Sequence, residues 1–111
     1  MPGIEFMPLA PFAESTSWLT VVTIDPVAFG VDREVVRQHL ESFDIESRPA
    51  WKPMHLQPLY ADHPTVGGAV SARIFDLGLC LPSGGGMTDS DVERVADAVL
   101  ASRGQRSRVC D

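Results

Sequence analysis

Residues 46–58 of this chain, ESRPAWKPMHLQP, restrict the possible folds more than any other stretch of the sequence. Each of the three prolines, at 49, 53 and 58, lacks an amide donor and fixes its own backbone, and each keeps the preceding residue out of the helical region. The stretch can therefore hardly be a helix or a central strand, and we expect a structureless loop that runs to Thr65. A connection of this length is uncommon in a compact domain and usually binds or covers something.

Before this loop the sequence predicts a strand, a helix and a second, short strand. Residues 18–25, WLTVVTID, are rich in β-branched side chains, and their alternate positions share one buried face, formed by Trp18, Thr20, Val22 and Ile24. The next segment has a suitable N-cap in Asp32 and apolar residues at helical spacing, namely Val36, Leu40 and Phe43. We expect the second strand at residues 44–47, DIES.

After the loop the sequence predicts another helix and another strand. Thr65 is the expected N-cap of a helix whose apolar face is formed by Val66, Val70, Ile74 and Leu77. We expect Gly78 to end this helix in the left-handed conformation that commonly follows a last turn. The segment GLCLP, residues 78–82, then predicts a short buried strand.

The last helix has the clearest signals in the sequence. Thr88 and Asp91 resemble a capping box, with Asp in place of the usual Glu. An apolar stripe follows, formed by Val92, Val95, Ala96, Val99 and Leu100. We expect the domain to span residues 1–104 and residues 105–111 to be a disordered tail, because the tail offers no apolar face.

Together these elements predict an α+β fold, a two-layer α/β sandwich in which helices cover one face of a small antiparallel or mixed sheet. A chain of 111 residues is long enough for one domain with one core. Fifteen acidic residues against nine basic ones, with scattered arginines, argue against a nucleic-acid partner. No apolar run approaches the roughly 18–20 residues that a membrane-spanning helix needs, so we expect no membrane insertion.

The first residues and the cysteines bear on the cellular location. Met1–Pro11 contains no basic residue and is broken by three prolines, unlike a secretion signal. Cys80 and Cys110 lie far apart, which suits reduced thiols better than a disulfide framework. We therefore expect a cytoplasmic protein.

The lysine and the histidines are the first candidates for chemistry. Lys52 is the only lysine, and an enclosed lysine can form an imine, but a loop position before a proline favours a solvated or anion-contacting ammonium. His39, His55 and His63 are not paired at metal-ligand spacing, so we expect no metal site. His39 shares a helix face with apolar residues and is expected to be a satisfied, partly buried histidine. His55, near cationic residues of the loop, is the better candidate for contact with an anion.

A glycine-rich stretch, PSGGGMT at residues 82–88, allows two interpretations. Free backbone N–H groups at the start of a helix can hold an anion. The stretch lacks the Gly-Lys-Ser/Thr ending of a phosphate-binding loop, however, and a flexible strand-to-helix turn is the interpretation that we favour.

Four segments resemble, in order, the C-terminal part of the DegT/DnrJ/EryC1/StrS family of pyridoxal-phosphate-dependent sugar-nucleotide aminotransferases. They are GIEFMPLAP (3–11), WLTVVTIDP (18–26), IESRPAWKPMHLQP (45–58) and GLCLPSGGGMTDSDVERV (78–95). The resemblance covers nearly the whole chain, and the long third motif is most similar to enzymes that act on UDP-linked 4-keto sugars. It implies the small C-terminal domain of a fold-type-I aminotransferase.

The resemblance also implies what this sequence does not contain. In the family a preceding large domain carries the cofactor cleft, the Schiff-base lysine and the aspartate that pairs with the ring nitrogen of the cofactor. Lys52 lies in a different motif and cannot inherit the role of that lysine. We therefore expect the large cofactor-binding domain to be absent, no catalytic residue in this chain, and no pyridoxal phosphate bound by it alone.

For the proline loop, the resemblance implies a position over the active site, where it helps to shape the sugar-nucleotide pocket. The expected substrate-binding residues are Arg48, Trp51, Lys52 and His55. Guanidinium and ammonium groups suit a diphosphate, and an aromatic ring can stack on a sugar or a base.

The sequence thus predicts the C-terminal domain of a nucleotide-sugar 4-keto aminotransferase, one that contributes the substrate-covering loop and is not catalytic alone. Whether the chain is itself an enzyme stays open. The expected partner is a separate large-domain chain or a homo-oligomer, and the nucleotide sugar would bind only in the assembled enzyme. The alternative is a non-catalytic binding or interaction module, or an evolutionary remnant, whose apolar loop residues cover a partner.

Overall fold

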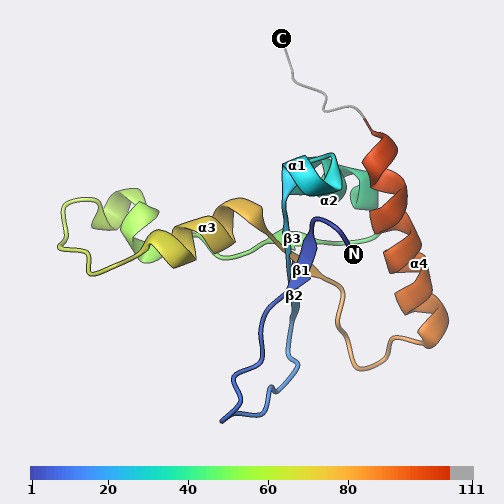
Figure 1. Cartoon of the computed structure of the whole chain (residues 1–111), viewed down its shortest axis with the longest axis horizontal. Coiled ribbons are helices and arrows are strands. Elements are labelled where there is room, and N and C mark those ends of the chain that lie inside the picture. The colour runs from blue at the N-terminus through green and yellow to red at the C-terminus, as the bar shows by residue number, and fades with distance from the viewer. Residues whose placement is uncertain (106–111) are drawn as a thin grey trace.

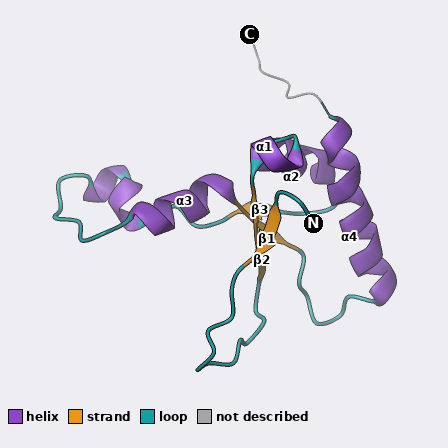
Figure 2. Ribbon diagram, viewed as in Figure 1, coloured by secondary structure: helices purple, strands orange, loops and turns teal. Residues whose placement is uncertain are grey.

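Four short strands form one antiparallel sheet in the computed structural model, which describes residues 1–105 (Figure 2). The strands are β1 (Ile4–Phe6), β2 (Thr20–Ile24), β3 (Arg48–Pro49) and β4 (Gly78–Leu81). Their order across the sheet is β1-β2-β4-β3, and each neighbouring pair is antiparallel. The expected α+β class is therefore confirmed, with an antiparallel sheet.

The helices are distributed unequally around this sheet. They are α1 (Pro26–Phe29), α2 (Arg33–Glu41), α3 (Ala69–Leu77) and α4 (Asp89–Ala101), with short 3₁₀ turns η1 (Met54–Leu56), η2 (Pro58–Tyr60) and η3 (Ser102–Gly104). In Figure 1, α1, α2 and α4 lie to one side of the strands, whereas α3 projects to the other side. None of the helices within residues 1–105 is long and apolar enough to cross a membrane.

The core lies between the sheet and α1, α2 and α4. One face of the sheet is buried through Val22, Ile24 and Leu79, which are paired or adjacent on β2 and β4. The helices contribute Phe29, Val35, Val36, Leu40, Val95, Ala98 and Val99. Burial of these side chains supplies the main driving force for the fold, at about 25 cal/mol per Å² of apolar surface.

Two of the predicted helix starts are confirmed in atomic detail. The Asp32 carboxylate accepts hydrogen bonds from the backbone N–H groups of Glu34 and Val35, both at 2.9 Å. At the start of α4, Thr88 and Asp91 form the complete capping box. These side chains satisfy N–H groups that have no partner inside their own helix.

The predicted strand at residues 44–47 is wrong in position. Asp44 has a φ of +56° and turns the chain after α2, and Ile45 inserts into the core. Only Arg48 and Pro49 pair with β4, and Arg48 lies opposite Cys80. The residues predicted to form a strand thus instead form a turn and place the Ile45 side chain in the core.

The predicted start of α3 is wrong as well. Gly67 and Gly68 have φ values of +73° and +103°, so the helical path begins only after them, at Ala69, and Thr65 does not cap it. Val66 and Val70 are consequently exposed, and the expected apolar face is reduced to its half-buried C-terminal part.

Gly78 does not take the predicted left-handed conformation. Its φ and ψ of −84° and 136° are extended, and it is the first residue of β4. Three further features were not predicted: β1, α1 and the 3₁₀ turns within the loop. The tail predicted for residues 105–111 lies, apart from Gln105, outside the described residues.

Candidate functional site

Residues 51–77 form an arm that projects from the sheet (Figure 1). Its two ends are tied together, because the Ala50 N–H donates to the Gly78 carbonyl at 3.1 Å. A Cβ on Gly78 would lie 2.7 Å from the Ala50 Cβ and 2.2 Å from the Ile74 carbonyl oxygen, so only glycine fits there. The chain therefore leaves and re-enters the sheet at one closely packed point.

The arm is ordered by contacts within itself. The imidazole of His55 rests against Gly68, and a Cβ at Gly68 would come within 2.9 Å of its Cε1 atom. The amide of Gln57 donates to the Lys52 carbonyl at 3.1 Å, and the 3₁₀ turns supply backbone bonds along the loop. The expectation of a structureless loop is therefore wrong, since the prolines direct tight turns rather than preventing order.

The four predicted substrate-binding residues lie at different places. Arg48 is on β3, and its guanidinium pairs with the Glu46 carboxylate at 2.6 Å. Trp51 and Lys52 are exposed at the base of the arm, and His55 is half-buried farther along it. Trp51, Lys52 and His55 thus all lie on the arm, whereas Arg48 lies on β3, just before the arm begins.

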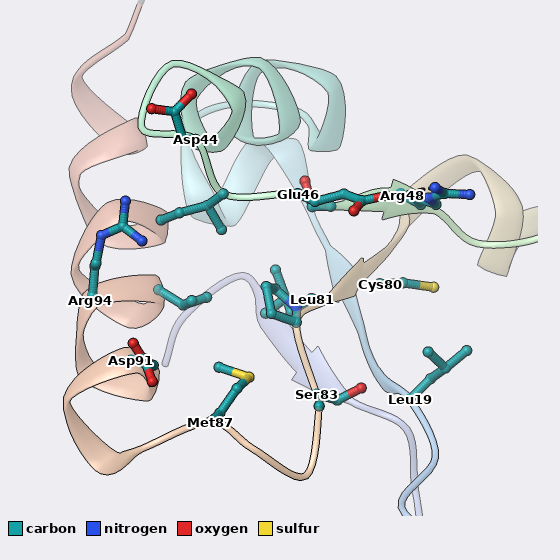
Figure 3. Close-up of a pocket in the computed structure, with 15 residues that line it drawn as sticks. Leu19, Asp44, Glu46, Arg48, Cys80, Leu81, Ser83, Met87, Asp91 and Arg94 are labelled. Atoms are coloured by element: carbon teal, nitrogen blue, oxygen red, sulfur yellow. Dashed lines mark hydrogen bonds and ion pairs between the residues drawn. The ribbon is translucent and has the colours of Figure 1, made fainter.

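A cavity of about 470 Å³ lies between α4 and the β3–β4 edge of the sheet (Figure 3). Arg94 and Asp91 border it from α4, while Arg48 and Cys80 border it from the strands. Of the four predicted residues, only Arg48 is in its lining. The predicted roles of Trp51, Lys52 and His55 therefore receive no support from this cavity.

Both arginines and Asp91 of this cavity have partners within the described chain, whereas the buried hydroxyl of Ser47 has none among those residues. Arg48 pairs with Glu46, and Arg94 donates to the Phe43 carbonyl. The Asp91 carboxylate accepts hydrogen bonds from the Thr88 backbone N–H and hydroxyl, which lower the pKa of Asp91. Burial raises the pKa of the Cys80 thiol, so this cysteine is held in its neutral form. An anionic ligand would have to compete with the Glu46 carboxylate for Arg48 and with the Phe43 carbonyl for Arg94.

The glycine-rich stretch before α4 behaves as a turn. The Ser83 hydroxyl donates to the Trp18 carbonyl at 3.0 Å, and the Met87 N–H donates to the Gly84 carbonyl at 3.1 Å. The first turn of α4 is occupied by its own acidic residues, Asp89 and Asp91, which disfavour a bound anion. The turn interpretation accounts for this geometry.

His39 departs from the expectation of a satisfied histidine. Its ring packs edge-on against Phe43, with centroids 5.0 Å apart, but its Nε2 atom is buried without a hydrogen-bond partner. No group of three or more His, Cys, Asp or Glu side chains that could hold a metal ion occurs within residues 1–105.

Trp18 is a candidate that the sequence analysis missed. The alternation of residues 18–25 predicted a buried side chain, but Trp18 precedes β2 and is 72% exposed. Its ring lies 5.9 Å from that of Trp51, which is 67% exposed, at an angle of 32°. Two loops that are distant in sequence thus present one aromatic surface at the base of the arm.

The described residues do not by themselves fit a pyridoxal-phosphate site. A covalent site needs a lysine enclosed beside its cofactor. Lys52, the only lysine, is exposed and does not line the cavity beside α4, and the arginines there are engaged with Glu46 and a carbonyl.

Comparisons with known proteins agree on one family. The model of the DegT/DnrJ/EryC1/StrS aminotransferase family matches residues 1–100. The aminotransferase EpsN of Bacillus subtilis is 38% identical over an alignment of 106 residues that covers 90% of this chain and 26% of EpsN. The GDP-perosamine synthase of Caulobacter vibrioides is 33% identical over 82 residues, which are 74% of this chain and 22% of that enzyme.

Solved structures give the same result. DesI in the presence of its TDP-sugar product matches with a TM-score of 0.77 and 25% identity, over 93% of this chain and 27% of DesI. The aminotransferase TlmJ from Streptoalloteichus hindustanus matches with a TM-score of 0.72 and 27% identity, over 90% of this chain and 26% of TlmJ. The chain thus spans about a quarter of the length of these relatives, since its share ranges from 22% to 27%.

Proposed function

Because the chain belongs to the DegT/DnrJ/EryC1/StrS aminotransferase family, we propose that residues 1–104 are the small C-terminal domain of an enzyme that aminates a nucleotide-linked 4-keto sugar. The family match covers residues 1–100 of this chain, and the chain corresponds to 26% of EpsN. On this proposal the domain contributes a cover for the substrate and does not transaminate alone.

The observation that carries the proposal is the arm. It projects from the sheet, it is held in shape by His55, Gly68 and the 3₁₀ turns, and it leaves large apolar side chains exposed. Trp51, Met54 and Leu59 are all more than half exposed. A surface of this kind is usually covered in the working protein.

The proposed roles follow from the chemistry of the side chains. Arg48 and Lys52 suit the diphosphate of a nucleotide sugar, and Trp51 can stack on its sugar or base. His55, fixed against Gly68, is in a position to donate to a phosphate or hydroxyl oxygen. For Arg48, binding would replace its present partner, Glu46.

We infer that pyridoxal phosphate and its lysine belong to the part of the enzyme that this chain does not match. That part would be supplied by a large-domain chain, and subunits would associate as a homo-oligomer or through that chain. When bound there, the cofactor supplies the electron sink for amino-group transfer. The wide sequence separation of Cys80 and Cys110, which suits reduced thiols, supports a cytoplasmic location for the assembled enzyme.

The exposed residues also favour a second function, a non-catalytic interaction module. Met54, Leu59 and Val70 could cover a protein partner as well as they could cover a substrate. This alternative needs no cofactor domain. It predicts that Arg48 and Lys52 can be replaced by uncharged residues without loss of function.

A chimera separates the two functions. Residues 1–104 would replace the matching quarter of EpsN, and amino-sugar formation would be measured with UDP-, GDP- and TDP-linked 4-keto sugars. We expect activity from the chimera and none from either part alone, and we expect Lys52→Met to raise the KM for the sugar nucleotide. A chimera that folds and holds the cofactor without turnover would contradict the proposal, as would turnover by the isolated chain.

A further inference from the structure

Arg33, in the first turn of α2, contacts the last turn of α3. Its Nε–H donates to the Asp76 carbonyl at 2.8 Å, and its guanidinium carbon lies 5.3 Å from the centroid of the Phe75 ring. The two contacting segments are more than forty positions apart in the sequence. Arg33 therefore joins the body of the domain to the arm.

The Asp76 carbonyl is one of the groups at the C-terminal end of α3 that the helix cannot satisfy itself. Gly78, which follows the helix, is extended and so does not form the left-handed cap that would satisfy them. A cation is favoured at this negative end of the helix dipole. Arg33 thus supplies the missing cap from a different helix.

The rest of α3 is weakly held. Although it lies wholly within the described residues, α3 has no buried residue, and only part of its surface near the sheet is half-buried. The packed tie between Ala50 and Gly78 and the stacking of Trp18 on Trp51 hold the base of the arm. Arg33 binds the last turn of α3 itself, so it restricts the direction in which this helix leaves the sheet.

We propose that Arg33 is a positioning residue that sets the direction of the arm. By capping α3 and stacking on Phe75, it fixes where the arm carries Trp51, Lys52 and His55. The inference that this placement matters for substrate binding rests on the proposed function. The inference that Arg33 fixes the direction of the arm, its mechanical role, does not. Both contacts use the planar guanidinium, and the ammonium of a lysine cannot reproduce its fork of donors and its flat stacking surface together.

Amide hydrogen exchange of the full chain tests the mechanical role. In Arg33→Gln we expect the amides of α3 to exchange about tenfold faster, the effect of losing one charge-assisted hydrogen bond. The amides of α2, β2 and α4 should keep their rates. Arg33→Lys should restore protection only in part.

Arg73→Gln is the matched control, because Arg73 is an exposed arginine on α3 itself. It should leave the exchange of α3 unchanged. Unchanged exchange in Arg33→Gln would overturn the proposal. Equal acceleration in α2 and β2 would also overturn it, since Arg33 would then support the whole fold rather than the arm.

The EpsN chimera tests the consequence for substrate. Arg33→Gln should raise the KM for the nucleotide sugar several-fold while the cofactor spectrum stays that of the parent chimera. If the parent chimera is inactive, the proposed function fails and the exchange result still decides the role of Arg33. If α3 loosens but the KM does not change, the arm does not position substrate groups, and that part of the inference is wrong.

Discussion

The imidazole ring of His55 occupies the space that a side chain on Gly68 would need. A Cβ at Gly68 would lie 2.9 Å from the His55 Cε1 atom and 3.0 Å from Nε2, closer than real Cβ atoms approach. Gly68 also has a φ of +103°, which side chains rarely allow. The start of α3 and the middle of the proline-rich loop therefore depend on each other.

Gly68→Ala should lower the free energy of local opening of the arm by about 1–3 kcal/mol, because it adds backbone strain and displaces the His55 ring. Amide exchange measures this opening. Gly67→Ala is the control for strain alone, since its φ is +73° and its Cβ would meet nothing within 4 Å. Removing His55 in the Gly68→Ala background should recover part of the loss. If it recovers nothing, the ring contact is not the cause.

Gly78→Ala should destabilise the whole domain by about 1–3 kcal/mol, since overpacking here pushes on backbone rather than on a movable side chain. The new Cβ would lie 2.2 Å from the Ile74 carbonyl oxygen. Urea unfolding gives the free energy. Gly85→Ala, where nothing lies within 4 Å, should be nearly neutral, and equal effects at both sites would contradict the packing argument.

Stability should fall at acid pH through Glu34. Its carboxylate accepts hydrogen bonds from the Arg37 guanidinium, which lowers the pKa of Glu34 below its ordinary value of 4.5. A lowered folded-state pKa means that the stabilisation is present above the ordinary value and is lost as pH falls through the lower one. Solvent screening limits it to under about 1 kcal/mol.

Urea unfolding at several pH values checks this prediction. Wild type should be more stable than Glu34→Gln near neutral pH, and the difference should shrink as the solution is acidified below the ordinary pKa. If the difference in unfolding free energy between wild type and Glu34→Gln stayed constant with pH, the pair with Arg37 would not change the pKa of Glu34 on folding.

Lys52 should not capture pyridoxal phosphate specifically. Because it is exposed and lies outside the cavity beside α4, we expect the purified chain to give no stoichiometric adduct that borohydride traps. Lys52→Ala should behave identically by absorbance and mass spectrometry. A reducible adduct that is lost in Lys52→Ala would mean that this chain carries a cofactor site of its own.

Sequence reasoning succeeded where the determining interactions are local. Asp32 and the Thr88–Asp91 pair cap helices within a few residues of themselves, and spacing alone predicted the burial of Val36 and Leu40. Residue types at fixed spacing are enough to predict such local interactions. The resemblance of four ordered motifs added the family, which the match over residues 1–100 confirms.

Sequence reasoning failed where contacts between residues that are distant in the sequence determine the structure. The three residues of β1 are a strand only because Ile4 pairs across to Ile24. The exposed position of Trp18 depends on a second aromatic ring, that of Trp51, from another loop. The roles assigned to Arg48, Trp51, Lys52 and His55 remain predictions, because they depend on surfaces outside this chain, which spans about a quarter of the length of its relatives (26% for EpsN).

The tie between Ala50 and Gly78 has an evolutionary consequence. Since the polypeptide departs from and returns to the sheet at adjoining residues, an insertion, deletion or exchange between them would leave the strand register untouched. Natural variation could therefore remodel the projecting segment while the scaffold stays the same. Changes in the length or sequence of the arm would thus leave the buried contacts between the sheet and its helices unaltered.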